Sequence, residues 1–133
     1  MKRLFHISLI LLPITIYLWV THLNNHGELP PFVRDIYKFP DGDKYGHFIV
    51  MGTVSAFVLA FSRLLLPLRF IKPGTFFIFV LLITLFTIEE FSQRAIPSRT
   101  FSFYDLLASY GGLTAGTIIA LLSTHKKVRD SLA

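Results

Sequence analysis

Long apolar blocks alternate with short polar segments along the chain, and each block is apolar nearly all round. We expect four of them to form transmembrane helices, over about 4–22, 45–66, 74–94 and 104–123. A soluble domain would instead show a polar face on each helix, because only one face meets the core. About 20 predominantly apolar residues suffice to cross a bilayer. The pattern therefore predicts an all-α integral membrane bundle, a single domain over 1–133.

The sequence also indicates where the predicted helices begin and end and what connects them. The first block follows a basic start, as a signal peptide would, but it reaches Trp19 without a small-x-small cleavage pattern and is expected to stay as a helix. Tyr17 and Trp19 suit the membrane interface. Prolines and glycines in segment 24–44 predict an extramembrane loop. The third block is short, so its helix should continue through Glu89 and Glu90.

Composition supports the membrane interpretation and excludes several functions. The chain is 53% hydrophobic, carries a net charge of +5 and contains no cysteine, with a mean hydropathy of +0.59. Disulfides, thiolate catalysis and cysteine metal sites are therefore excluded. The basic residues flank apolar blocks and form no stripe with aromatic residues, so we expect no nucleic-acid binding.

The distribution of basic residues predicts the topology. With a cytoplasmic N-terminus, the inner side holds eight basic residues and one acid, and the outer side five basic residues and seven acids. Together these are the 13 basic and 8 acidic residues of the chain. Because short cytoplasmic loops carry the excess of Lys and Arg, both termini are expected inside, in a cytoplasmic (inner) membrane. Almost all acids then lie at the outer face.

The head of the second predicted helix holds the first group of functional candidates, Asp43, Lys44 and His47. Asp43 and His47 are four residues apart and would share a helix face. Asp43 could equally be a helix N-cap. His47 lies within an apolar helix, where a titratable ring needs a partner.

Two further groups of polar residues are expected at the same boundary. Glu89 and Gln93 share a face of the third helix, whereas Glu90 points about 100° away, and which carboxylate faces the bundle stays open. If Glu89 faces the bundle, it would pair with Arg99, Lys44 or protonated His47. The guanidinium of Arg99 suits a carboxylate or a phosphate. Asp105 is either a site residue or part of a capping box that begins at Ser102.

The fourth predicted helix is rich in small residues, and Gly112 and Gly116 form a GxxxG motif. Such a face allows close helix approach inside lipid. It could pack within the chain or against a second copy, so the oligomeric state stays open.

Taken together, these segments resemble the VanZ-like family of small bacterial membrane proteins, named for a member associated with teicoplanin resistance. The resemblance rests on Asp43-Lys44-x-x-His47, Glu89-x-x-x-Gln93, Pro97-Ser98-Arg99, and Asp105 followed by Gly111, Gly112 and Gly116. Two positions depart from the family pattern: Ser109, where Asn is common, and Met51, where an aromatic residue is frequent. The resemblance implies a cell-envelope role and a part in glycopeptide resistance.

Several functions are compatible with these residues. In the leading hypothesis, Lys44, Gln93 and Arg99 bind a membrane lipid, a lipid-linked cell-wall precursor or a glycopeptide. Catalysis would add His47 as acid or base, with Asp43, Glu89 or Asp105 as carboxylates. A metal on these acids and His47 is possible in type, but there is no HExxH motif or second nearby histidine, and we predict neither metal nor cofactor. The alternative is a structural or assembly protein that uses the GxxxG helix.

Overall fold

Four long helices make up nearly all of the computed structural model, which describes residues 2–36, 38–66, 71–96 and 99–130. They are α1 (Lys2–His26), α3 (Gly42–Leu65), α4 (Ile71–Ser92) and α5 (Phe103–Asp130). Each is long and apolar enough to cross a membrane, and no strand occurs among the described residues. The predicted all-α architecture is confirmed, and the protein is a multi-pass membrane protein whose helices contact lipid.

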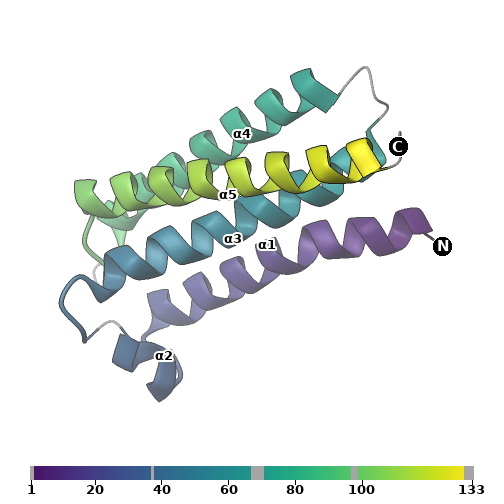
Figure 1. Ribbon diagram of the computed structural model, residues 1–133. Helices are drawn as coiled ribbons and strands as arrows, with labels where there is room; N and C mark the ends of the chain where they lie inside the picture. Colours follow the sequence, from purple (N-terminus) through teal and green to yellow (C-terminus); the bar gives the residue numbers. More distant parts are fainter. Residues whose placement is uncertain (1, 37, 67–70, 97–98, 131–133) are drawn as a thin grey trace.

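Two short elements complete the fold at one end of the bundle. The segment predicted as a loop contains a short helix, α2 (Pro31–Ile36). The 3₁₀ turn η2 (Gln93–Ala95) follows α4 directly, so the helical path continues past both glutamates as expected. In Figure 1, α2 lies at the end where α1 and α4 finish and α3 and α5 begin, and the start of α1 and the end of α5 lie at the opposite end.

The closest helix pair is α3 and α5, which approach through small residues. A Cβ atom added to Gly112 would lie 2.2 Å from the Phe48 carbonyl oxygen, and one added to Gly116 would lie 2.1 Å from that of Gly52. Gly52 itself faces the backbone of Gly112. The GxxxG face is thus covered by α3 of the same chain. Such contact replaces the hydrophobic drive that is missing between helices in lipid.

Hydrogen bonds and apolar packing join the helices around this pair. Buried Ser55 donates to the carbonyl oxygen of Leu113 at 2.9 Å, across the α3–α5 contact. The buried apolar core includes Met51, Val54 and Val58 of α3, Leu82 and Phe86 of α4, and Leu113 of α5. On α1, Tyr17 packs edge-on against Phe86, with ring centroids 5.2 Å apart. These contacts join side chains of all four helices into one packed core.

Candidate functional site

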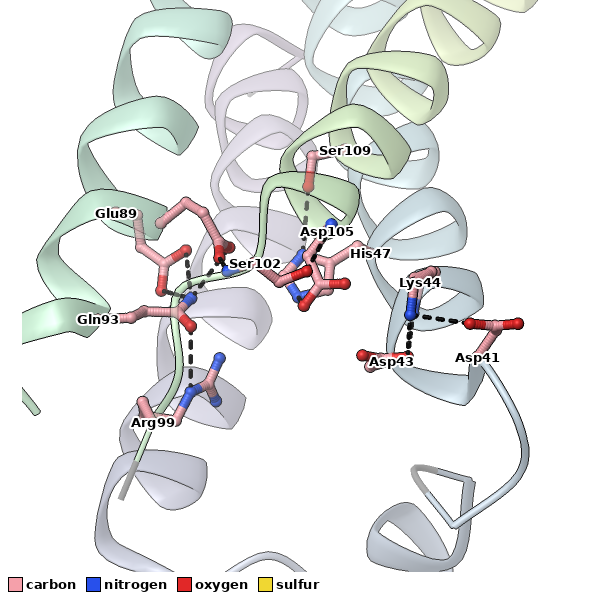
Figure 2. A network of polar contacts seen from close by, with 11 residues as sticks. Asp41, Asp43, Lys44, His47, Glu89, Gln93, Arg99, Ser102, Asp105 and Ser109 are labelled. Carbon is pink, nitrogen blue, oxygen red and sulfur yellow. Dashed lines mark hydrogen bonds and ion pairs between the residues drawn. The ribbon is translucent and has the colours of Figure 1, made fainter. Parts of the chain in front are cut away.

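Gln93 is the centre of a polar network at the end where α4 finishes (Figure 2). Its side chain is almost fully buried, at 2% exposure. The amide nitrogen Nε2 donates to Glu89 Oε1 at 3.2 Å and to Glu90 Oε2 at 3.2 Å. The amide oxygen accepts a bond from Arg99 Nε at 3.3 Å. A neutral amide thereby separates two carboxylates from a guanidinium while bonding to all three, as only a group with both donors and an acceptor can.

Glu90 is the carboxylate that faces the bundle interior, and it fastens α4 to the start of α5. Only 2% of it is exposed. Its Oε1 accepts the backbone N–H of Ser102 at 3.1 Å. Ser102 Oγ in turn accepts the N–H of Asp105 at 3.3 Å. One half of the predicted capping box is therefore present. A complete capping box would also have the Asp105 side chain accept the backbone N–H of Ser102, but Glu90 accepts that N–H instead. The Asp105 carboxylate is therefore available for other contacts.

His47 is held between two residues of α5. Its Nδ1 lies 3.2 Å from Ser109 Oγ, within hydrogen-bonding distance. Its Nε2 lies 4.0 Å from Asp105 Oδ2, an ion pair whenever the ring is protonated. Asp105 Oδ1 is buried and has no hydrogen-bond partner in the part of the chain that the structure describes. The histidine inside an apolar helix thus has the partners that its position requires.

The trio of Ser109, His47 and Asp105 combines the residue types of a serine hydrolase, but its geometry supports an anchored histidine. Ser109 is buried, at 3% exposure, and it is not among the residues that line the cavity described below. The 4.0 Å separation between His47 and Asp105 is too long for the hydrogen bond that orients a catalytic base. Ser109 therefore positions the imidazole and offers no accessible nucleophile.

Lys44 and Asp43 belong to a separate cluster. Lys44 Nζ lies 2.8 Å from Asp41 Oδ1 and 3.3 Å from Asp43 Oδ1. Asp43 is not the N-cap of α3, because Asp41 holds that position, in a left-handed backbone conformation and without a side-chain capping bond. Figure 2 shows this cluster on the other side of His47 from Gln93 and Arg99. The structure brings His47, Glu89, Gln93, Arg99 and Asp105 together and leaves Asp43 and Lys44 at the edge.

A cavity of about 250 Å³ lies beside the network, between α1 and α3. Its polar lining includes Tyr17, Thr21, His47, Glu89 and Arg99. The rest of the lining is largely apolar: Pro13, Ile16, Val20, Gly46, Ile49, Val50, Met51 and Val54. A mostly apolar wall with a few convergent polar groups is typical of a ligand site.

Three contributors to this site were not among the sequence-based candidates. Tyr17, expected at the membrane interface, packs against Phe86 and lines the cavity. Glu90 was the alternative to Glu89, and both turn out to bond Gln93. Ser109 belongs to no predicted site in the sequence, and only the fold places its hydroxyl beside His47. For Glu90, the i, i+3 spacing to Gln93 was the one usable signal, since residues three and four apart are neighbours on a helix.

Comparisons with known proteins give this chain no relative: no family model, no curated protein and no solved structure matches it. Across residues 2–36, 38–66, 71–96 and 99–130, no group of three His, Asp or Glu side chains is placed to hold a metal ion.

Proposed function

We propose that this protein is a VanZ-like cell-envelope protein that binds the headgroup of a membrane lipid or lipid-linked cell-wall precursor at the end of the bundle where α4 finishes. The observation that carries the proposal is the cavity between α1 and α3. Its walls are apolar where the helices meet lipid, and its polar end combines Arg99, Glu89, His47 and Tyr17. A headgroup attached to a hydrocarbon chain has the same division into polar and apolar parts.

The binding role needs less from the site than catalysis would. Arg99 supplies a planar donor fork, and Gln93 fixes it through Nε. An acid–base role would need His47 to exchange a proton with a ligand. Both ring nitrogens already face α5 side chains, so a ligand would have to displace one of them. We therefore infer binding, with His47 as part of the cavity wall.

Arg99 can be tested against a matched arginine on the same end of the bundle. Arg94 lies over the rings of Phe91 and Phe101, 4.8 Å and 4.1 Å from their centroids, and is not in the cavity lining. In cells that depend on this protein for teicoplanin tolerance, we expect Arg99→Ala to reduce tolerance to that of cells lacking the protein. Arg94→Ala should keep most of it. The readout is the inhibitory teicoplanin concentration at equal membrane levels of each variant. Equal tolerance in both variants would overturn the proposal.

The proposal also places the site outside the cytoplasmic membrane, with both termini inside, because the predicted cytoplasmic segments carry more basic residues. The absence of native cysteine allows a direct test. We expect Thr100→Cys, at the site end, to react with a membrane-impermeant maleimide in intact cells. Ser123→Cys, near the other end of α5, should react only after permeabilisation. The reverse labelling pattern would place the site in the cytoplasm.

A further inference from the structure

The cavity between α1 and α3 joins the lipid-facing surface to the polar network. Among its lining residues, Ile16, Ile49 and Val50 are 50%, 63% and 40% exposed. In a membrane, such apolar side chains meet lipid chains. A lipid could therefore enter the cavity sideways from the bilayer, with its hydrocarbon chain kept against these residues.

The polar end of the cavity holds one cation and one anion that do not neutralise each other. Arg99 and Glu89 make no ion pair with each other, although both line the cavity. Arg99 donates through Nε to Gln93, and its Nη1 and Nη2 donate to no described residue. Glu89 accepts both of its Gln93 bonds from the same Nε2 atom, at 3.2 Å and 3.4 Å. Gln93 thus keeps the two charges apart, and each retains bonding capacity toward the cavity.

We propose that the cavity binds a zwitterionic phospholipid that carries a primary ammonium, as phosphatidylethanolamine does. The phosphate pairs with Arg99, the ammonium with Glu89, and an acyl chain lies between α1 and α3. This inference rests on the proposed function and names the headgroup that the site takes.

Charge complementarity selects this class over two common alternatives. A lipid whose only charge is the phosphate, such as phosphatidylglycerol, would satisfy Arg99 but place a second negative charge near Glu89, which is unfavourable at low dielectric. A choline headgroup carries the positive charge but has no N–H to donate to the carboxylate. Loss of a charge-assisted hydrogen bond costs about 1.5–3 kcal/mol, about tenfold or more in affinity.

The test compares lipids of identical acyl chains bound to the full-length protein, measured by native mass spectrometry from detergent micelles. On the unaltered protein, we expect phosphatidylethanolamine to bind about tenfold more tightly than phosphatidylcholine or phosphatidylglycerol. Glu89→Gln should remove the preference for ethanolamine over choline. Arg99→Gln should weaken all three lipids, whereas Arg94→Gln should change none, because Arg94 lies outside the cavity.

The outcomes separate this inference from the proposed function. Equal binding of the ethanolamine and choline lipids, or a preference for phosphatidylglycerol, would overturn the zwitterion assignment. If lipid binding is nevertheless weakened by Arg99→Gln, the proposed headgroup site is still supported. Lipid binding that is unaffected by Arg99→Gln would overturn the inference, and unchanged teicoplanin tolerance in Arg99→Ala would then overturn the proposed function as well. The comparison of lipids on the unaltered protein needs no variant to fold.

Discussion

Gly116→Ala is expected to separate α3 from α5 and to lower the fraction of folded protein strongly. The added Cβ would lie 2.1 Å from the Gly52 carbonyl oxygen and 2.9 Å from its carbonyl carbon. Both are backbone atoms, so no side-chain rotation relieves the overlap, and the helices have to move apart. Overpacking typically costs about 1–3 kcal/mol and occasionally more, and we expect the upper part of that range here.

The sign of this effect makes it diagnostic. Alanine is a better helix former than glycine by about 1 kcal/mol, so an exposed Gly→Ala change should stabilise a helix. Gly111 provides the control on the same helix, because its added Cβ would meet only the Phe48 ring, at 3.4 Å. Unfolding titrations in mixed micelles should show Gly111→Ala as neutral or stabilised and Gly116→Ala as strongly destabilised. Similar stability of the two variants would show that α3 and α5 are not in this contact.

The helices and their small-residue contact could be predicted from the sequence because each depends on local composition. An apolar block of sufficient length has few alternatives to a membrane helix. Gly112 and Gly116 show where a helix can approach closely but not which helix does so. The partner, α3, has its own small residues at Gly52 and Ala56, which lie against Gly116. Only the fold shows that the face is used within the chain.

The inward face of α4 could not be predicted, for a physical reason. This helix is apolar all round, so hydrophobic periodicity carries no information about which side packs against protein. Leu82, Phe86, Glu90 and Gln93 are buried, while Leu85 and Ile88 remain exposed although they are equally apolar. The position of Lys44 differs from the prediction for another reason. It was expected to supply the site with a cation, but Asp41, one turn earlier, holds it.

Loss of the Glu90 carboxylate should destabilise the site more than loss of its neighbour Glu89. Glu90 is buried and accepts the backbone N–H of Ser102 and a Gln93 Nε2 proton. In Glu90→Ala, the Ser102 N–H has no acceptor and the link between α4 and the start of α5 is lost. A donor left without its partner costs about 1–3 kcal/mol, and because the Ser102 N–H is only partly buried, we expect about 2 kcal/mol.

Glu89→Ala is the matched control, since the same group is removed one residue earlier. Glu89 is partly exposed in the cavity and bonds Gln93, whose Nε2 also donates to Glu90 and so does not depend on Glu89 alone for a partner. We expect a loss of about 1 kcal/mol, measured as for the glycine variants. Glu90→Gln should recover part of the stability, because its amide oxygen can still accept from Ser102. If Glu89→Ala were the more damaging change, α4 would have to present Glu89 to the interior. That result would contradict the hydrogen bonds described for Gln93. It would also contradict the separation of the Glu89 and Arg99 charges that these bonds maintain.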